Sequence, residues 1–415
     1  MMLKFEDAFE IVMDSISGKP PGTERVDIDR ALNRILAEDI ASDMDIPPFN
    51  KSAMDGYACR RAELDNELTV IETIGAGYMP QKAIGRNQCS KIMTGAVVPE
   101  GADCVIMVEH TEKTSDNKIR FTPLEIRGAK RKQKAKNPLT GFIGEHSTDN
   151  ICFKGEDIKK GEVVVRGGIK ISAQHIAVLA SLGCTRPLVA IQPRVGIIAT
   201  GSELVEPDRK PAACQIRNSN AFQLAAQVTS ASATATNYGI AADTEEAIDS
   251  MFKKAAAEND VVIFSGGVSM GDYDLVPGIL EKNNVRLLFE KVAVKPGRPT
   301  VFGVSNEIFC FGLPGNPVST FIIFELFVKP FLFKMMGHNF KPVVSYGQLE
   351  RTITSKKTER DSWLPVVFTE NNEVAIIEYH GSAHINALSE ADGLLCMPAG
   401  IAEIKEGTTV AVRQI

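Results

Sequence analysis

The turn at residues 313–319, Leu-Pro-Gly-Asn-Pro-Val-Ser, is the feature that most limits how this chain can fold. An apolar run at 308–312 precedes it and a long run with helical periodicity, 318–331, follows it. The segment therefore predicts a strand, a sharp turn and a helix. The first turn of a helix favours negatively charged ligands, because its N–H groups are unpaired and the dipole is positive there. Taken alone, the segment is more typical of an ordinary strand–helix connection than of an oxyanion site.

The same order of strand, glycine turn and helix recurs earlier in the chain. Apolar strands are predicted at 194–200 and 260–264, and helices at 220–229 and 275–282. Strands that are apolar throughout and alternate with helices indicate a parallel sheet covered on both faces. Ligands of such folds bind beyond the carboxyl ends of the strands.

The remaining segments show other sequence patterns. Helical periodicity is present at 3–16, 28–38 and 172–182, and a final strand is expected at 408–413. Between them lie short β-like runs bounded by glycine and proline, at 68–74, 104–108 and 119–121. We predict a multidomain α/β and β fold. Its expected parts are a discontinuous N-terminal domain (1–46 with 150–185), an inserted strand-rich domain (47–149), a central doubly wound α/β domain (186–340) and a small C-terminal β-barrel domain (341–415).

Charge argues against nucleic acid as a partner. The net charge of −6 repels polyanions, so a phosphate or oxyanion site has to create its own positive field. Residues 127–136 form a dense basic run, but no aromatic residue interrupts it. A solvated loop explains this run better than a nucleic-acid surface does.

Membrane insertion and secretion are not expected either. The N-terminus lacks the apolar core of a signal peptide. The most apolar stretch, 321–328, is too short to span a bilayer and contains Glu325, so it is predicted to be a buried helix. The eight cysteines form no Cys-x-x-Cys pair and are expected to be free thiols in a reducing compartment. We therefore expect a cytoplasmic protein.

Acidic and basic residues gather where the predicted strands end. Glu203 and Asp274 lie in glycine-containing loops, as does Asp272, which is equally well read as a turn residue. Carboxylates beside a phosphate-binding loop are unfavourable unless a divalent cation lies between them, an arrangement that Mg²⁺ uses. Lys291 and Lys295 lie four residues apart in an extended stretch, where they would share a face. Together these groups describe a site for a polyanionic ligand and a metal.

The strand-rich region has two further candidates. Asp55 precedes a glycine in an apolar, turn-rich setting, and Thr94 also precedes a glycine. An isolated Asp-Gly pair is usually a turn.

In this order, the motifs resemble the molybdopterin molybdenumtransferase family, which is related to the E domain of gephyrin. The likeness spans nearly the whole chain. The segments that carry it are 47–58 (PPFNKSAMDGYA), 93–96 (MTGA), 155–157 (GED), 200–204 (TGSEL), 265–269 (SGGVS), 295–299 (KPGRP) and 313–319 (LPGNPVS).

The resemblance implies an elongated homodimer and a reaction. Molybdate and adenylylated molybdopterin are the substrates, Mg²⁺ is required, and molybdenum cofactor and AMP are the products. The dithiolene sulfurs of the pterin ligate the metal, so no protein cysteine is needed. Transient contacts with the preceding adenylyltransferase and with molybdoenzyme chaperones are expected, and contacts with membranes or nucleic acid are not.

The resemblance also assigns residues. The expected catalytic residues of the functional cleft are Asp55, Thr94, Asp157, Glu203 and Asp274, of which Glu203 and Asp274 are metal-linked. Substrate and phosphate binding is expected of Ser265, Gly266, Gly267, Ser269, Lys291, Lys295, Arg298 and Ser382. Molybdate binding is expected of Pro314, Gly315, Asn316, Pro317 and Ser319.

Two positions depart from the family pattern. Cys152 stands where an arginine is common, with Lys154 nearby as a substitute, and Ser202 stands where an aspartate is common. Three alternatives remain open. The adenylyltransferase of the preceding step is disfavoured by the extra β domains, and a purely structural scaffold by the intact acids. Nothing in the sequence separates a molybdate insertase from a tungstate insertase.

Overall fold

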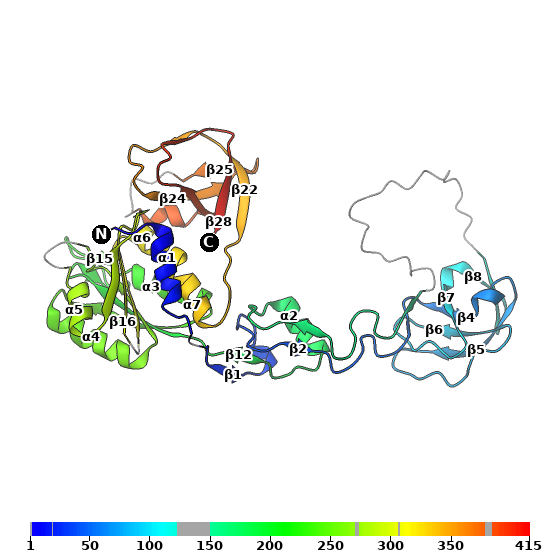
Figure 1. Ribbon diagram of the computed structural model, residues 1–415. Helices are drawn as coiled ribbons and strands as arrows, with labels where there is room; N and C mark the ends of the chain where they lie inside the picture. Colours follow the sequence, from blue (N-terminus) through cyan, green and yellow to red (C-terminus); the bar gives the residue numbers. More distant parts are fainter. Residues whose placement is uncertain (1, 19, 123–149, 270–273, 306–307, 378–383) are drawn as a thin grey trace. The chain divides into compact units, whose positions relative to one another are not determined.

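The chain forms two compact units (Figure 1). This computed structural model describes residues 2–18, 20–122, 150–269, 274–305, 308–377 and 384–415. Unit 1 comprises 1–38, 166–180 and 184–415, and unit 2 comprises 39–165 and 181–183. Unit 2 is therefore an insertion in unit 1. The finer division into four domains stays a prediction.

A six-stranded sheet forms the centre of unit 1. Its strand order is β16 (Thr234–Ala241), β13 (Arg194–Thr200), β17 (Val261–Ser265), β21 (Phe309–Leu313), β20 (Pro299–Val304) and β18 (Arg286–Lys291). The first four strands are parallel, as the sequence predicted, whereas β20 and β18 add an antiparallel edge that was not expected. The carboxyl ends of β13, β17 and β21 consequently meet at one edge.

Helices cover both faces of this sheet, so the doubly wound arrangement is confirmed. Helices α3 (Asn220–Ser230) and α6 (Pro317–Ile323) contribute to the larger apolar cluster. Helices α4 (Glu245–Glu258) and α5 (Val276–Lys282) contribute to the second cluster. Adjacent residues of one strand, Ile197 and Ile198, belong to different clusters because successive side chains point to opposite faces.

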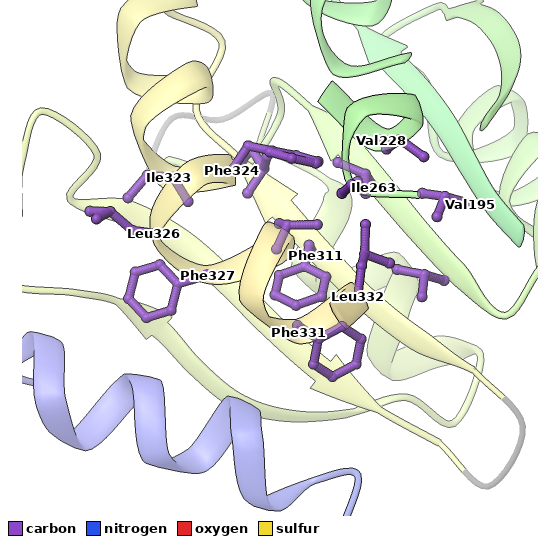
Figure 2. Packing of buried hydrophobic residues seen from close by; sticks show 14 of the residues in the cluster. Val195, Val228, Ile263, Phe311, Ile323, Phe324, Leu326, Phe327, Phe331 and Leu332 are labelled. Carbon is purple, nitrogen blue, oxygen red and sulfur yellow. The ribbon is translucent and has the colours of Figure 1, made fainter. Parts of the chain in front are cut away.

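The helix after the Pro-Gly turn has three parts. Helix α6 is followed by a π-helical segment, Phe324–Val328, and by α7 (Lys329–Met335). All five residues of the π-helical segment are buried, and Figure 2 shows Phe327 and Phe331 in this packing. The ring of Phe331 meets that of Phe311 edge-on, with centroids 5.2 Å apart. The prediction of a buried helix is confirmed, and the helices of the described residues include none that is both long and apolar enough to cross a bilayer.

The C-terminal strands close into a barrel, as predicted. The cycle runs β24 (Asp361–Phe368), β25 (Glu373–Ile376), β22 (Val344–Leu349), β28 (Thr409–Gln414), β26 (Gly393–Met397) and back to β24. Short β19 (Val294–Lys295) joins β24 from outside. The barrel interior holds an apolar cluster that includes Leu349, Val366 and Val412.

Unit 2 is built on a six-stranded sheet of its own. Its order is β7 (Cys104–Met107), β4 (Gly56–Cys59), β6 (Gln88–Ile92), β5 (Leu68–Ile74), β9 (Lys118–Phe121) and β8 (Thr111–Ser115). Pairing is antiparallel except between β5 and β6. The ends of unit 2 are joined by antiparallel pairing of β2 (Ile40–Ala41) with β11 (Val163–Val165). The predicted strand-rich character of this region is confirmed.

The N-terminal part of unit 1 agrees with two of the three helix predictions. Helix α1 spans Phe5–Asp14 and α2 spans Ala173–Ser181. The helix expected at 28–38 is wrong, because only a 3-10 turn at Ile28–Arg30 forms there. The N–H groups of Asn33 and Leu36 instead donate to the carbonyls of Ile171 and Ile169, at 2.8 and 2.9 Å. Pairing with a remote segment overrides the local periodicity.

Truncating the core side chain of Phe331 should destabilise unit 1. We expect Phe331→Ala to lower the free energy of unfolding by about 3–5 kcal/mol, because a fully buried ring is lost and a cavity remains. Urea unfolding followed by the fluorescence of Trp363 reports on unit 1, since this tryptophan is the only one in the chain and lies in β24. Phe222→Ala, at a half-exposed position of α3, should change stability little. Equal costs for the two variants would contradict the packing described.

Candidate functional site

A cavity of about 690 Å³ lies at the carboxyl edge of the parallel strands in unit 1. The turns that follow β13, β17 and β21 all contribute to its wall. This is the place where folds of this class bind ligands. The predicted site residues that line the cavity are Glu203, Ser265, Gly266, Gly267, Ser269, Asp274, Pro314, Gly315, Asn316 and Pro317.

The glycine turn after β17 tolerates no side chain. Gly266 and Gly267 have φ values of +95° and +68°, a region that other residues rarely adopt. A Cβ on Gly266 would lie 2.6 Å from the carbonyl oxygen of Thr200, and one on Gly267 would lie 2.8 Å from its Oγ1. Glycine is required here for packing against β13, and it also leaves backbone donors open to close approach by a ligand.

The Pro-Gly turn after β21 is tied to its neighbours by Asn220, the first residue of α3. The Asn220 Nδ2 atom lies 2.9 Å from Ser265 Oγ, 2.7 Å from the Gly315 carbonyl oxygen and 3.3 Å from Thr320 Oγ1. The N–H of Gly266 donates to the carbonyl of Leu313 at 3.0 Å. The Asn220 side chain and the backbone bond from Gly266 to Leu313 thus hold the turns after β17 and β21 together.

Among the described residues, three carboxylates line the cavity. Glu203 and Asp274 were predicted, whereas Asp243, which follows β16, was missed. Asp243 accepts a hydrogen bond from the N–H of Ser202, with 2.7 Å between Oδ2 and N, so an acid does lie beside the position where the family pattern has one. Asp243 lies just beyond the end of β16, a strand of the same sheet, and this position is the signal that could have identified it. Within the described ranges, no three His, Cys, Asp or Glu side chains converge on one metal position.

Within the described part of unit 1, four predicted residues do not line this cavity: Lys291, Lys295, Arg298 and Ser319. Lys291 ends β18, whereas Lys295 lies in β19, which pairs with the barrel strand β24. The expectation that the two lysines share a face of one extended segment is therefore wrong. Lys295 instead lines a separate hollow of about 400 Å³ together with Arg351 of the barrel.

Three further predicted residues, Asp55, Thr94 and Asp157, lie in unit 2. The Asp55 carboxylate accepts hydrogen bonds from the Thr94 N–H (2.7 Å) and the Thr94 hydroxyl (2.8 Å). These two bonds, the backbone one first, lower the pKa of Asp55, and the positive charge of Lys91 adds to the effect. Asp55 is thus held ionised. Gly56 is required next to it, because a Cβ there would lie 1.9 Å from the Ile106 carbonyl oxygen.

The remaining predictions receive less support from the geometry. Asp157 is exposed in unit 2, where its N–H donates to the Ile46 carbonyl at 3.1 Å. Lys154 lies 3.5 Å from Asp45, with which it forms an ion pair. Ser382, Asp272 and the basic run at 127–136 lie outside the described residues.

Comparison with known proteins decides the family. Residues 3–183 match the model of the MoeA N-terminal region (domains I and II). Residues 196–334 match a probable molybdopterin binding domain, and 346–415 match the MoeA C-terminal region (domain IV). The chain is 35% identical to the molybdopterin molybdenumtransferase of Staphylococcus epidermidis over 93% of its length and 90% of that protein. The chain belongs to the molybdopterin molybdenumtransferase family.

Other members of the molybdopterin molybdenumtransferase family agree. The Bacillus subtilis protein of that name is 35% identical, over 94% of this chain and 89% of the relative. The crystal structure of a molybdopterin biosynthesis moeA protein from Pyrococcus horikoshii OT3 superposes with a TM-score of 0.81, at 31% identity and full coverage of both chains. The names of these relatives support a role in molybdenum cofactor biosynthesis and the enzyme class of transferases.

Removing the Thr94 hydroxyl should raise the pKa of Asp55. In Thr94→Val the backbone N–H still donates, so the pKa should rise only part of the way to its ordinary value. Carbon-13 NMR titration of the Asp55 carboxyl measures this directly. Thr94→Ser keeps a hydroxyl and serves as the control. An unchanged pKa in Thr94→Val would contradict the hydrogen bond between the two side chains.

Proposed function

We propose that this chain inserts molybdate into adenylylated molybdopterin and releases AMP, forming molybdenum cofactor. The observation that carries the proposal is the cavity at the carboxyl edge of the parallel strands. It lies in the region that matches a probable molybdopterin binding domain. Its wall combines a glycine turn, a Pro-Gly turn and carboxylates, which suits a ligand with both phosphate and metal-binding groups.

Glu203 and Asp274 are the proposed ligands of Mg²⁺. Sites of this kind take one or two carboxylates and complete the coordination with substrate phosphate oxygens and water. The carboxylates that line the cavity fit that pattern, and a cage made of protein groups alone is not required. Bound there, the ion would polarise the pyrophosphate and offset its charge.

The other groups bind and position the substrates. Ser265, Gly266, Gly267 and Ser269 are proposed to contact a phosphate through hydroxyl and backbone donors. The turn at Pro314, Gly315, Asn316 and Pro317 is proposed to receive the molybdate dianion. Lys291, Lys295, Arg298, Ser319 and Ser382 keep their proposed roles as binding residues on the family likeness alone. The chemistry asks the protein mainly to position reactants and neutralise charge.

Asp55 with Thr94, and Asp157, are the proposed contributions of unit 2. The two hydrogen bonds from Thr94 support this, since they hold the Asp55 carboxylate in one orientation. A homodimer, a cytoplasmic location and contacts with the preceding adenylyltransferase and with chaperones are proposed from the same likeness.

Single-turnover AMP release tests the proposal. Purified chain is mixed with adenylylated molybdopterin, Mg²⁺ and either molybdate or tungstate. We expect oxyanion-dependent release, and a loss of about 100-fold or more in Asp274→Ala, the order found when one electrostatic stabiliser is removed. Glu246→Ala, on the exposed first turn of α4, is the matched control and should react normally.

Each alternative gives its own result in this experiment. Faster release with tungstate would identify a tungstate insertase. Tight pterin binding without AMP release would indicate a scaffold, and no binding would remove the proposed function.

A further inference from the structure

We infer that Asn220 is a positioning residue, whose amide orients the Ser265 hydroxyl so that its proton is available to an anionic oxygen of the substrate. This inference rests on the proposed function and adds to it a residue that no motif marks. Asn220 lies at the start of α3, and both it and Ser265 line the cavity.

The orientation of the Asn220 amide follows from its partners. The Gly315 carbonyl oxygen can only accept a hydrogen bond, and it lies 2.7 Å from Nδ2. The NH₂ group must therefore face Gly315, because the reversed amide would place two oxygens against each other. Thr320 fits this arrangement, since its hydroxyl donates to the Pro314 carbonyl and lies within 3.3 Å of Nδ2 as an acceptor.

The orientation of Ser265 follows in turn. Its Oγ atom lies 2.9 Å from Nδ2 of Asn220 and accepts this hydrogen bond. A hydroxyl that accepts from one side still has its own proton to donate. The described residues place no acceptor within reach of that proton. Because Ser265 lines the cavity, an oxyanion of a bound ligand is the natural acceptor.

Stability alone does not explain this amide. Asn220 is 9% exposed, and its Oδ1 atom is buried without a hydrogen-bond partner among the described residues. A buried acceptor that lacks a hydrogen-bond partner destabilises the folded protein. An arrangement that tolerates this cost while it holds a cavity-lining hydroxyl is typical of a functional site.

The control comes from the opposite end of the same sheet. Asn259 precedes β17 and is also buried, at 5% exposure. Its Nδ2 donates to the Tyr238 hydroxyl and to the Ala255 carbonyl, both at 2.8 Å. Asn259→Ala thus removes a comparable buried amide away from the cavity.

The experiment is a double-mutant cycle on single-turnover AMP release from adenylylated molybdopterin, with the rate constant and the half-saturating substrate concentration measured separately. We expect Ser265→Ala and Asn220→Ala each to lose about tenfold in one of these quantities, the size of a hydrogen bond to a charged group. The double variant should be no worse than the poorer single variant, because one residue acts through the other. Asn259→Ala should unfold more easily and react as wild type does.

The outcomes separate the two proposals. If wild type releases no AMP, the proposed function falls and this inference falls with it. If wild type reacts but Asn220→Ala reacts equally well, or the two losses multiply in the double variant, the inference alone is overturned. Should Asn220→Ala fail to fold, Ser265→Ala decides, since a normal reaction in that variant removes the hydroxyl from the mechanism.

Discussion

The close approach of the backbone to Thr200 at the end of β17 is the constraint on which the candidate cavity depends. A Cβ on Gly266 would lie too close to the Thr200 carbonyl oxygen, and one on Gly267 would crowd the Thr200 hydroxyl. This contact sets how near the turns after β13 and β17 come to each other, and the bond from Gly266 to Leu313 extends the arrangement to β21. The shape of the cavity is therefore set by backbone packing, and this backbone frame positions its polar groups.

The buried residue Glu325 connects this frame to the C-terminal barrel through its backbone carbonyl. Glu325 lies in the π-helical segment, where its Oε2 is 2.7 Å from Lys329 Nζ and its Oε1 is 3.0 Å from Gln227 Nε2. The guanidinium of Arg413, in β28, donates to the Glu325 carbonyl. Burial lowers the pKa of Arg413, while the charge of Glu325 opposes that shift. A charge this deep persists because each of its oxygens has a partner.

Hydrophobic periodicity in the sequence made much of the fold predictable. Long-range contacts explain the features of the fold and of the candidate site that the sequence did not predict. Strand β13 was predicted with its observed bounds because residues 195–199, all buried, form an unbroken apolar run. The antiparallel edge strands β18 and β20 have weaker hydrophobic periodicity than β13. The helix predicted at 28–38 does not form, because backbone groups of this segment bond to remote residues. Within the candidate site, the glycine and proline turns were visible as motifs. Asn220 was not, since its partners lie 45 and 95 residues away.

Because unit 2 is inserted in unit 1, the order of synthesis affects which unit can fold first. Its two ends pair through β2 and β11, so residues 39–165 contain the complete partner set of their own sheet. Helix α1 emerges from the ribosome earlier, but Phe5 packs on Phe327, which is made far later. Since domains fold as units while the chain grows, the inserted unit can mature first. The nascent N-terminal helix meanwhile keeps an apolar face uncovered until Phe327 has been synthesised.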